Sequence, residues 1–479
     1  MKINEVPLIV DLDYTLVNSD TLVESSIKAL SKNFLNLFKL IYWLFLGKSF
    51  FKYKVSENFS VDPKLLPYRS EVLDFITNEK KKGRKIFLCS GAGKNQVRKV
   101  HEHLGLFNDY FSSSFSENLI KKNKAKLLIK KFGVKQFDYI GDSIDDIVIW
   151  EKSNTVHTVN ISNRVKKILI KKNIQINEIV KNTNIVSHII NFISAIRLYQ
   201  WSKNLLIFLP IVLSQEFTQE NFLNSFIAFI CFSFVASSVY VFNDIFDIQN
   251  DRSHPRKKYR MIASGKMKIP FMVIVAIVSL FISFVISLYF LNYAYTIGLI
   301  FYLFLNFLYT LILKKIFLLD VVTLSIFYVI RIICGGLSSE INLSNWLFVF
   351  SAFFFIFLAL IKRLAELLSL KDDNLATYGR SYNKGRIALV KSFTLLSSVI
   401  SIFLLVLYFL SEKVLTLYHN EYILLLICPL FFYWQLNIFF DTKNKKMFDD
   451  PILYIIRNKK SWLLFFAMFT IIISQMKIW

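Results

Sequence analysis

The chain is organised around residues 243–260, which read NDIFDIQNDRSHPRKKYR. This stretch directly follows an apolar run, residues 226–242, which with its flanks is long enough to cross a bilayer. A membrane helix is therefore expected to end in a cluster of amide and carboxylate side chains, with a strongly basic loop after it.

The spacing of the acidic residues in this stretch indicates a cation site. Asn243, Asp247 and Asp251 lie four residues apart, so they share one face if the helix continues. With Asp244 the cluster holds three carboxylates, which repel one another unless a cation neutralises them. Oxygen ligands suit Mg2+, and the basic residues that follow can hold a polyphosphate. The alternative is a solvated helix end with a basic loop, but acidic groups at a membrane helix end need a reason.

The composition predicts two parts. Of the 479 residues 54% are hydrophobic, including 49 Phe, which indicates a polytopic membrane protein. Charged residues concentrate in the first part, so we predict a soluble domain at residues 1–185 and a membrane domain at residues 186–479. The net charge of +24 is explained largely by basic loops on one side of the membrane, and nucleic acid is not expected as a partner.

Three short apolar runs in the soluble domain read as buried strands, and polar residues follow each. The runs are residues 6–10, 85–89 and 137–140, followed by Asp11-Leu12-Asp13-Tyr14-Thr15, Ser90-Gly91-Ala92 and Gly141-Asp142-Ser143-Ile144-Asp145-Asp146. Helical stretches at residues 96–104 and 124–132 alternate with them. This order predicts an α/β fold with a doubly wound parallel sheet, whose functional groups lie at the carboxyl ends of the strands. No secretory signal is expected before the first strand.

These motifs resemble, in order and across the whole domain, the four motifs of the haloacid-dehalogenase superfamily of phosphohydrolases. The resemblance implies that Asp11 is the nucleophile that takes the phosphoryl group and that Asp13 is the general acid and base. It assigns loop orientation to Thr15 and phosphate contacts to Ser90 and Lys124, with Lys126 as a substitute because the lysine run leaves the register open. It implies Mg2+ held by Asp11, Asp13, Asp142 and Asp146, with Asp145 as a near alternative. The opposing interpretation is a decayed domain kept for folding.

An insertion between the first two motifs is large enough to form a helical cap. Within it, residues 34–46 read FLNLFKLIYWLFL and are apolar nearly all round, but they are short for a membrane span. We expect them to form the core of the cap, with a membrane-surface anchor as the alternative. An anchored cap would suit a lipid-linked substrate.

The membrane domain contains about nine apolar runs, so it is expected to be all-α and polytopic. They lie near residues 204–214, 222–242, 270–290, 293–313, 316–338, 344–361, 392–410, 421–440 and 461–476. The connections on one side are rich in Lys and Arg, whereas those on the other contain only Lys413. The basic side is therefore cytosolic. We predict a multi-pass protein of the plasma (inner) membrane whose soluble domain and active sites face the cytosol.

Further polar and ionisable residues gather on the same side of the membrane domain. They are Lys203 before the first helix, Tyr309 and Lys314 near the end of the fourth, Asp320 and Arg331 in the fifth, Lys362 and Arg363 at the end of the sixth, and Asp449 and Asp450 before the ninth. An ionisable residue inside an apolar helix is a site candidate. The alternatives are an ion pair between Arg331 and Asp320, three helical turns apart, and simple interfacial anchoring by Lys362 and Arg363.

The membrane domain resembles the UbiA superfamily of intramembrane prenyltransferases, and within it most closely the decaprenyl-phosphate phosphoribosyltransferases. That branch carries Asn-Asp-x-x-Asp-x-x-x-Asp followed by His-Pro-x-Lys-x-x-Arg. The matching residues are Asn243, Asp244, Asp247, Asp251, His254, Pro255, Lys257 and Arg260. The chain departs from the branch at Met261, where Pro is usual. It also has no second Asp-x-x-x-Asp after Lys314, which the superfamily's aromatic prenyltransferases usually carry.

The resemblance implies transfer of a 5-phosphoribosyl group from phosphoribosyl diphosphate to a polyprenyl phosphate. Mg2+ on Asn243, Asp247 and Asp251 would hold the leaving diphosphate. The remaining phosphate contacts would come from Lys257, Arg260, Lys314 and Arg331. The product keeps a 5-phosphate that the soluble domain could remove, leaving polyprenyl-phosphoryl ribose. Tethering would raise the effective concentration of the second site to about mM.

Two other functions stay open at this stage. One is a UbiA-type enzyme that moves a prenyl group from a prenyl diphosphate to a small acceptor. Its soluble domain would act on an unrelated phosphate ester or only as a scaffold. The other is a lipid-binding or transport protein without covalent turnover, against which the acidic clusters at helix ends argue.

Overall fold

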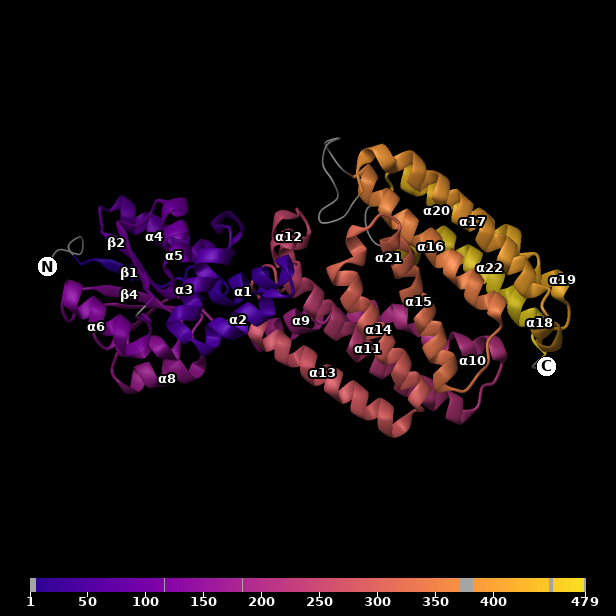
Figure 1. Cartoon of the computed structure of the whole chain (residues 1–479), viewed down its shortest axis with the longest axis horizontal. Helices are drawn as coiled ribbons and strands as arrows, with labels where there is room; N and C mark the ends of the chain where they lie inside the picture. The colour runs from indigo at the N-terminus through magenta and orange to yellow at the C-terminus, as the bar shows by residue number, and fades with distance from the viewer. Residues whose placement is uncertain (1–5, 116, 183, 370–381, 448–450, 478–479) are drawn as a thin grey trace. The chain divides into compact units, whose positions relative to one another are not determined.

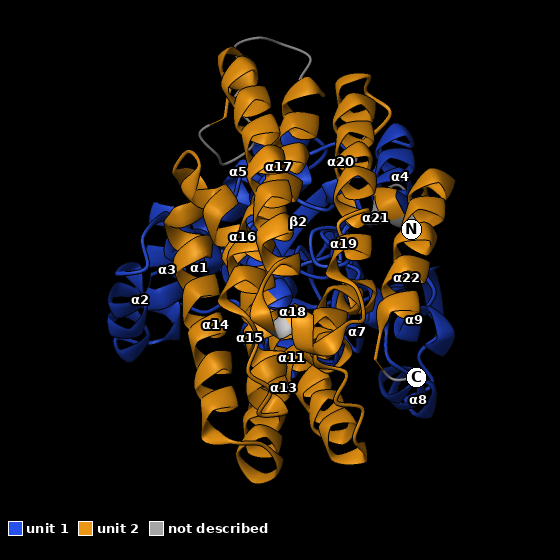
Figure 2. Ribbon diagram, turned by 90° about the vertical axis from the view of Figure 1, so that its right-hand side faces the viewer, with its two compact units in different colours: residues 1–196, 240–275 blue, residues 197–239, 276–479 orange. Residues whose placement is uncertain are grey.

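The computed structural model describes residues 6–115, 117–182, 184–369, 382–447 and 451–477, and it divides the chain into two compact units. Unit 1 comprises residues 1–196 and 240–275, and unit 2 comprises residues 197–239 and 276–479 (Figure 2). Residues 240–275, which carry the acidic cluster and its basic loop, therefore fold with the N-terminal part. The boundary at residue 185 stays a prediction, and Asp449 and Asp450 lie outside the described residues.

Unit 1 is built on a six-stranded parallel sheet with the strand order β3-β2-β1-β4-β5-β6 (Figure 1). The strands are β1 (Leu8–Val10), β2 (Ile86–Gly93), β3 (Asp109–Ser113), β4 (Asp138–Gly141), β5 (Val156–Val159) and β6 (Ile176–Val180). In register, Val10 at the end of the central strand β1 pairs with Leu88 and Ile140 on its two neighbours. The residues that follow these strand ends are thereby brought to one edge of the sheet.

Helices follow the strands and cover both faces of the sheet, which is why β1 is apolar throughout. They are α4 (Ser70–Lys81), α5 (Lys94–Leu104), α6 (Lys121–Phe132), α7 (Ile147–Trp150) and α8 (Asn163–Lys171), with the 3-10 turn η3 (Ile144–Asp146). Leu8 and Val10 pack with the residues of α4 and α5, whereas Ile9 packs with those of α6 and α8. This alternation is the period of a strand buried on both sides. The predicted α/β fold is confirmed.

The cap inserted between β1 and β2 differs from the sequence expectation. It consists of α1 (Thr21–Lys32), α2 (Asn36–Phe45), α3 (Lys48–Phe59) and the turn η2 (Pro63–Leu65). Leu40 is buried, and Trp43 contacts Phe59. The exposed large apolar side chains are Phe34, Leu35, Phe38, Ile41, Tyr42, Leu44, Phe45 and Leu46. The expectation of a cap core is therefore wrong for most of this run, because one side of α2 suffices to close the small cap core.

Seven helices among the described residues are long and apolar enough to cross a membrane, so the protein is a multi-pass membrane protein. They are α11 (Gln219–Phe246), α13 (Ile269–Phe290), α14 (Tyr293–Leu311), α15 (Leu319–Ser338), α16 (Asn345–Leu368), α17 (Ile387–Phe409) with the turn η7 (Lys384–Arg386), and α19 (Glu421–Leu424) continued by α20 (Ile427–Lys443). The remaining elements are α9 (Ile185–Ala195), η4 (Leu198–Phe208), α10 (Leu209–Ser214), α12 (Ile248–Ser253), η5 (Lys257–Tyr259), η6 (Leu313–Lys315), α18 (Glu412–Leu417), α21 (Pro451–Arg457) and α22 (Lys459–Gln475).

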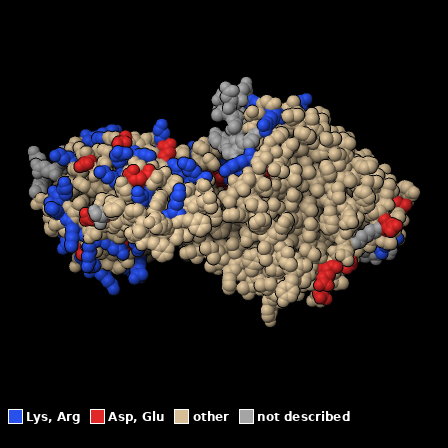
Figure 3. Space-filling view, viewed as in Figure 1, with Lys and Arg blue, Asp and Glu red and all other residues tan. Residues whose placement is uncertain are grey.

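The expected count of about nine spans is not confirmed. The first run, near residues 204–214, is divided between the 3-10 helix η4 and the six-residue helix α10, with Pro210 at its start. The last run forms α22, which has only 17 residues. The two units differ in surface charge. Lys and Arg side chains cover much of the visible surface of unit 1, whereas the visible face of unit 2 is mostly uncharged (Figure 3).

Candidate functional site

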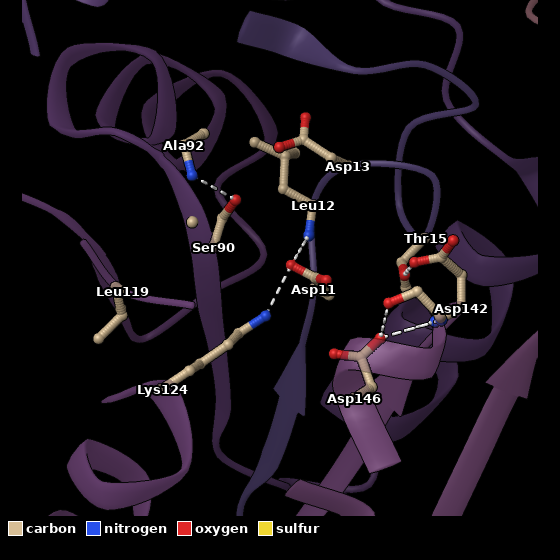
Figure 4. Close-up of polar contacts among 12 residues, drawn as sticks. Asp11, Leu12, Asp13, Thr15, Ser90, Ala92, Leu119, Lys124, Asp142 and Asp146 are labelled. Atoms are coloured by element: carbon tan, nitrogen blue, oxygen red, sulfur yellow. Dashed lines mark hydrogen bonds and ion pairs between the residues drawn. The ribbon is translucent and has the colours of Figure 1, made fainter. Parts of the chain in front are cut away.

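Asp11 follows the last residue of β1 and lies against a buried lysine (Figure 4). Its Oδ1 is 2.9 Å from Nζ of Lys124 and accepts a hydrogen bond from the backbone N–H of Leu12 at 2.8 Å. Lys124 is 4% exposed on the inner face of α6, whereas Lys126 is exposed on its outer face. The structure therefore places Lys124, and not its predicted substitute, beside the nucleophile candidate.

Three carboxylates form a candidate metal centre at the same edge of the sheet. Asp11, Asp142 and Asp146 each offer one oxygen, and these atoms lie within 4.8 Å of one another. Asp146 is held by the phenol of Tyr139, which donates to Oδ1 at 2.8 Å, and by the N–H of Asp142, which donates to Oδ2 at 3.2 Å. A Cβ at Gly141 would lie 2.7 Å from that Oδ2, so a larger residue there would displace the carboxylate. An all-oxygen, acidic donor set fits Mg2+.

Asp13, a predicted metal ligand, and Asp145, the near alternative, lie outside the three-carboxylate group. Oδ1 of Asp13 accepts hydrogen bonds from N and Oγ1 of Thr21, both at 2.8 Å, and its carboxylate does not join the three-carboxylate group. The carboxylate of Asp13 therefore contacts the first turn of α1, and its part in holding Mg2+ stays a prediction. Asp145 is exposed and pairs with Lys121 at 3.2 Å.

Burial separates the pKa values of the first two aspartates. Desolvation raises the pKa of Asp11 to about 6, with the charge of Lys124 acting against it. Desolvation, followed by repulsion from Asp20, raises the pKa of Asp13 to about 8, although Thr21 donates to it. At neutral pH the first group is ionised and the second protonated. These are the states that a nucleophile and a general acid need.

The remaining motif residues shape the loops around this centre. Thr15 is fully buried and donates through Oγ1 to Oδ1 of Asp142 at 3.3 Å. Ser90 is also fully buried, and its Oγ accepts from the N–H of Ala92 at 3.1 Å. Ser90 lies within β2 and Thr15 in the loop after β1, and their phosphate-binding and loop-orienting roles stay predictions.

Two cationic residues near the centre were missed by the sequence reasoning. Lys52, on α3, donates through Nζ to O of Gly91 at 2.8 Å, and burial lowers its pKa. Arg69 donates through Nε to O of Tyr14 at 3.3 Å. Neither belongs to a recognisable motif. Lys52 reaches the site because the cap folds over it, whereas Arg69 lies at the N-cap of α4. The run of aromatic residues around Lys52 was the only available signal.

The second acidic cluster lies at the junction of α11 and α12, within unit 1. Asp247 N donates to O of Asn243 at 2.9 Å and Asp251 N donates to O of Asp247 at 2.8 Å, so the four-residue spacing survives across the helix break. Nη1 of Arg260 lies 3.0 Å from Oδ1 of Asp244 and 2.7 Å from Oδ2 of Asp251. Among the His, Cys, Asp and Glu side chains of the described residues, only Asp11, Asp142 and Asp146 bring three ligand atoms together. In the second cluster Arg260 supplies positive charge to two of the carboxylates.

The basic loop after α12 is shaped by His254. Its Nδ1 accepts hydrogen bonds from the N–H groups of Arg256 and Lys257 at 3.2 and 3.3 Å, which begins the turn η5. Burial raises the pKa of Asp251 to about 6, with the charge of Arg260 acting against it. The motif histidine thus has a structural role that presents Lys257 and Arg260 after the acidic cluster.

In unit 2 the ionisable residues of α15 have different partners from those expected. Nε of Arg331 donates to Oδ1 of Asn204 at 2.8 Å. Asp320 pairs through Oδ2 with Nε of Arg363 at 2.6 Å and accepts a hydrogen bond from the phenol of Tyr382. The alternative of an Arg331–Asp320 pair is therefore wrong.

Arg363 is 1% exposed, so interfacial anchoring is wrong for this residue. Its Nη1 lies 2.6 Å from Oε2 of Glu366, and its Nη2 has no hydrogen-bond partner among the described residues. Tyr309 is buried against the ring of Phe327. The other predicted contacts are partly exposed cations: Lys362 on α16, Lys314 in η6, and Lys203, whose Nζ lies 6.0 Å from the ring centroid of Tyr328.

Sequence comparison links this arrangement to known proteins. Residues 205–449 match the model of the UbiA prenyltransferase family. The uncharacterized protein y4nM of Sinorhizobium fredii is 32% identical over 465 residues, 96% of this chain and 89% of that protein. The decaprenyl-phosphate phosphoribosyltransferase of Corynebacterium glutamicum is 34% identical over 184 residues, 37% of this chain. That match spans about half of the enzyme's own length, 54%.

Structural comparison finds two kinds of neighbour. A UbiA homolog from Archaeoglobus fulgidus bound to DMAPP and Mg2+ covers 59% of this chain and 99% of its own, with 14% identity and a TM-score of 0.44. A substrate-bound phosphoserine phosphatase covers 36% of this chain and 99% of its own, with 18% identity and a TM-score of 0.26.

Proposed function

Since the chain belongs to the UbiA prenyltransferase family, we propose that it transfers a 5-phosphoribosyl group from phosphoribosyl diphosphate to a polyprenyl phosphate and then removes the ribose 5-phosphate. The final product is polyprenyl-phosphoryl ribose. One observation carries the proposal: a phosphohydrolase-like centre of Asp11, Lys124, Asp142 and Asp146 occurs in one chain with the motif at residues 243–260. The similarity to decaprenyl-phosphate phosphoribosyltransferases supports the choice of donor and acceptor.

In the transfer step, an oxygen of the lipid phosphate attacks the anomeric carbon of the ribose and the bond to the diphosphate breaks. Stabilising the leaving diphosphate is the main electrostatic task. Asn243, Asp247 and Asp251 would hold Mg2+, which neutralises that group when bound. Arg260 lies between two carboxylates of the cluster and is placed to exchange this ion pair for a phosphate. Lys257 follows His254 in the same loop and would add a second phosphate contact.

In the hydrolytic step, Asp11 attacks the phosphorus of the 5-phosphate while Asp13 gives its proton to the departing ribose oxygen. Lys124 compensates the charge of the phosphoryl oxygens, and Asp142 and Asp146 would complete a Mg2+ site with Asp11. Water then attacks the phosphorus of the aspartyl phosphate, an acyl phosphate, and releases phosphate and the Asp11 carboxylate, with Asp13 taking the proton of the water. The raised pKa values of the two aspartates support this division of roles.

The basic connections between the membrane helices support a location in the plasma (inner) membrane with both sites on the cytosolic side. On that side the soluble donor and the phosphate product are both accessible. The expected partners are therefore polyprenyl phosphate, phosphoribosyl diphosphate and the lipid bilayer.

Product analysis in membranes tests the proposal. Membranes containing the protein are incubated with labelled phosphoribosyl diphosphate, a polyprenyl phosphate and Mg2+, and the lipid products are separated. The wild type should give a ribose lipid without 5-phosphate, Asp11→Asn a 5-phosphorylated lipid, and Asp247→Asn no labelled lipid. If no label enters lipid, the donor is wrong. Turnover of a prenyl diphosphate with a small acceptor would then establish the other UbiA-type reaction.

A further inference from the structure

The end of α12 and the loop after it are fixed to the cap of the phosphohydrolase-like domain, within unit 1. Nη1 and Nη2 of Arg252 lie 2.7 and 2.6 Å from the two carboxylate oxygens of Glu24 on α1. Nη1 also donates to O of Leu65 at 3.1 Å, and Nε donates to O of Ala263 at 2.7 Å. The side chains are 5% and 0% exposed. A buried, fully hydrogen-bonded pair of this kind fixes one arrangement of two segments.

A close backbone contact fixes the loop a second time. Gly265 has a φ of +73°, and a Cβ there would lie 2.0 Å from O of Asn18. Nδ2 of Asn18 donates to O of Ser264 at 3.4 Å. Asn18 lies three residues after Thr15, so residues 263–268 are held directly against the loop that carries the first motif.

This contact brings a lysine of the loop to the edge of the phosphohydrolase-like centre. Nζ of Lys268 lies 4.5 Å from the ring centroid of Tyr14, the residue between Asp13 and Thr15. The positive charge of Lys268 also acts on the carboxylate of Asp142. Lys268 is exposed, so its N–H groups are open to a ligand that approaches the centre.

The position of Lys268 in the chain indicates which ligand this is. Ile269, the next residue, begins the membrane-spanning helix α13. The first residue before a span lies at the membrane–water interface, the level of lipid phosphates. A lipid-linked ribose 5-phosphate has one phosphate to be removed and one phosphodiester at that level. A free sugar phosphate has the phosphate to be removed but no phosphodiester.

We propose that Lys268 binds the phosphodiester of the lipid-linked substrate while the 5-phosphate lies at Asp11. The segment of residues 252–268 thereby makes the phosphohydrolase select lipid-linked over free sugar phosphates. This inference rests on the proposed function and names the specificity-determining residue of its second step. Arg252, Glu24 and Gly265 are positioning residues, which keep Lys268 beside the centre.

The test uses the full chain in nanodiscs and two substrates, ribose 5-phosphate and a short-chain prenyl-phosphoryl ribose 5-phosphate. The measured quantity is selectivity, the ratio of kcat/KM for the lipid-linked substrate to kcat/KM for ribose 5-phosphate. Lys268→Met should lower it roughly tenfold or more, the effect of one lost charged hydrogen bond, mainly through KM. Lys268→Arg should keep most of it. Lys266→Met is the matched control, because Lys266 is exposed on the same segment, and it should leave selectivity unchanged.

A second variant tests whether the position of Lys268 matters as well as its charge. Gly265→Val keeps the lysine but displaces the segment from Asn18, so it should lower selectivity as Lys268→Met does. Unchanged selectivity in both variants would overturn the inference while the wild type still hydrolyses the lipid-linked substrate. An Asp11-dependent wild type that hydrolyses only ribose 5-phosphate would overturn the proposed function and the inference together.

Discussion

Nζ of Lys124 lies 2.9 Å from Oδ1 of Asp11 at the carboxyl edge of the sheet, and the two side chains are only 5% and 14% exposed. The lysine offsets part of the burial penalty of the aspartate and is placed to compensate phosphoryl charge in the transition state. Lys124→Met should therefore lower kcat for 5-phosphate hydrolysis by roughly 10²–10³, the usual effect of removing one preorganised electrostatic contact. The rate of phosphate release from the lipid-linked substrate measures this kcat.

The neighbouring lysine run supplies the control for this prediction. Lys126 is on the same helix but exposed, so Lys126→Met should hydrolyse the substrate like the wild type. Equal losses in the two variants would mean that the charge of the whole helix matters, and not the contact with Asp11.

The three-carboxylate group predicts a specific pattern of Mg2+ dependence. Asp146→Asn removes one ligand charge and should abolish Mg2+-supported phosphate release. Tyr139→Phe removes only the phenol that donates to Asp146, and it should raise the Mg2+ concentration for half-maximal rate by about 10-fold. Asp145→Asn is the matched control. It should need the same Mg2+ concentration for half-maximal rate as the wild type, because Asp145 pairs with Lys121 outside the group. A Mg2+ titration of phosphate release distinguishes the three. A loss in Asp145→Asn as large as in Asp146→Asn would refute the assignment.

The separated pKa values of Asp11 and Asp13 predict a bell-shaped pH dependence of hydrolysis. Activity should fall as the pH drops through about 6, because Asp11 becomes protonated. It should also fall as the pH rises through about 8, because Asp13 loses the proton that it donates. Asp13→Asn should lower the rate and remove the basic limb.

Mg2+ adds a sharper test of the same assignment. Asp11 belongs to the three-carboxylate group and the carboxylate of Asp13 does not. Raising the Mg2+ concentration should therefore move the acidic limb to lower pH and leave the basic limb in place. A parallel shift of both limbs would place the carboxylate of Asp13 among the ligands.

The sequence could predict the sheet and its motif residues because each of them is local. A strand of buried residues such as Leu8, Ile9 and Val10 has to end where polar groups begin, and the following aspartates then lie at the strand end. The choice between Lys124 and Lys126 could not be made, because it depends on which face α6 turns toward the sheet. The burial of α2 could not be predicted for the same reason, because its apolar pattern did not show which face would be covered.

Contacts between distant segments were beyond prediction from the sequence. Arg363 reaches Asp320 across 43 positions, so the nearer Arg331 looked like the natural partner. The pair of Arg252 and Glu24 spans 228 positions and joins segments assigned to different domains. No sequence pattern predicts either contact, because each depends on how two elements pack.

Arg260 bridges Asp244 and Asp251, and this bridge predicts how the transfer site responds to substitution. Arg260→Met leaves the carboxylates of Asp244 and Asp251 without the positive charge of the guanidinium, and it removes a predicted diphosphate contact. We expect KM for phosphoribosyl diphosphate to rise at least roughly tenfold, the effect of a lost charged hydrogen bond, with partial recovery in Arg260→Lys. Steady-state transfer to polyprenyl phosphate measures it. Lys258→Met is the control, since Lys258 is exposed and contacts the ring of Tyr259. An unchanged KM in Arg260→Met would limit Arg260 to a structural role.

Nη2 of Arg363 has no hydrogen-bond partner among the described residues. We therefore predict that Arg363 binds substrate as well as stabilising the fold. Its other two guanidinium contacts hold Asp320 and Glu366. Arg363→Lys should lose transfer activity, because an ammonium group cannot hold both carboxylates and reach a phosphate as well. Arg363→Leu alone should also unfold more easily, by about 3–5 kcal/mol, because Asp320 is left buried and uncompensated.

A double variant separates binding from stability. Asp320→Leu with Arg363→Leu removes both charges, and replacing a buried pair by apolar residues is often neutral for stability. The double variant should therefore recover thermal stability in detergent but not transfer of the phosphoribosyl group. If it regains activity together with stability, the unpaired nitrogen binds no substrate and Arg363 serves the fold alone.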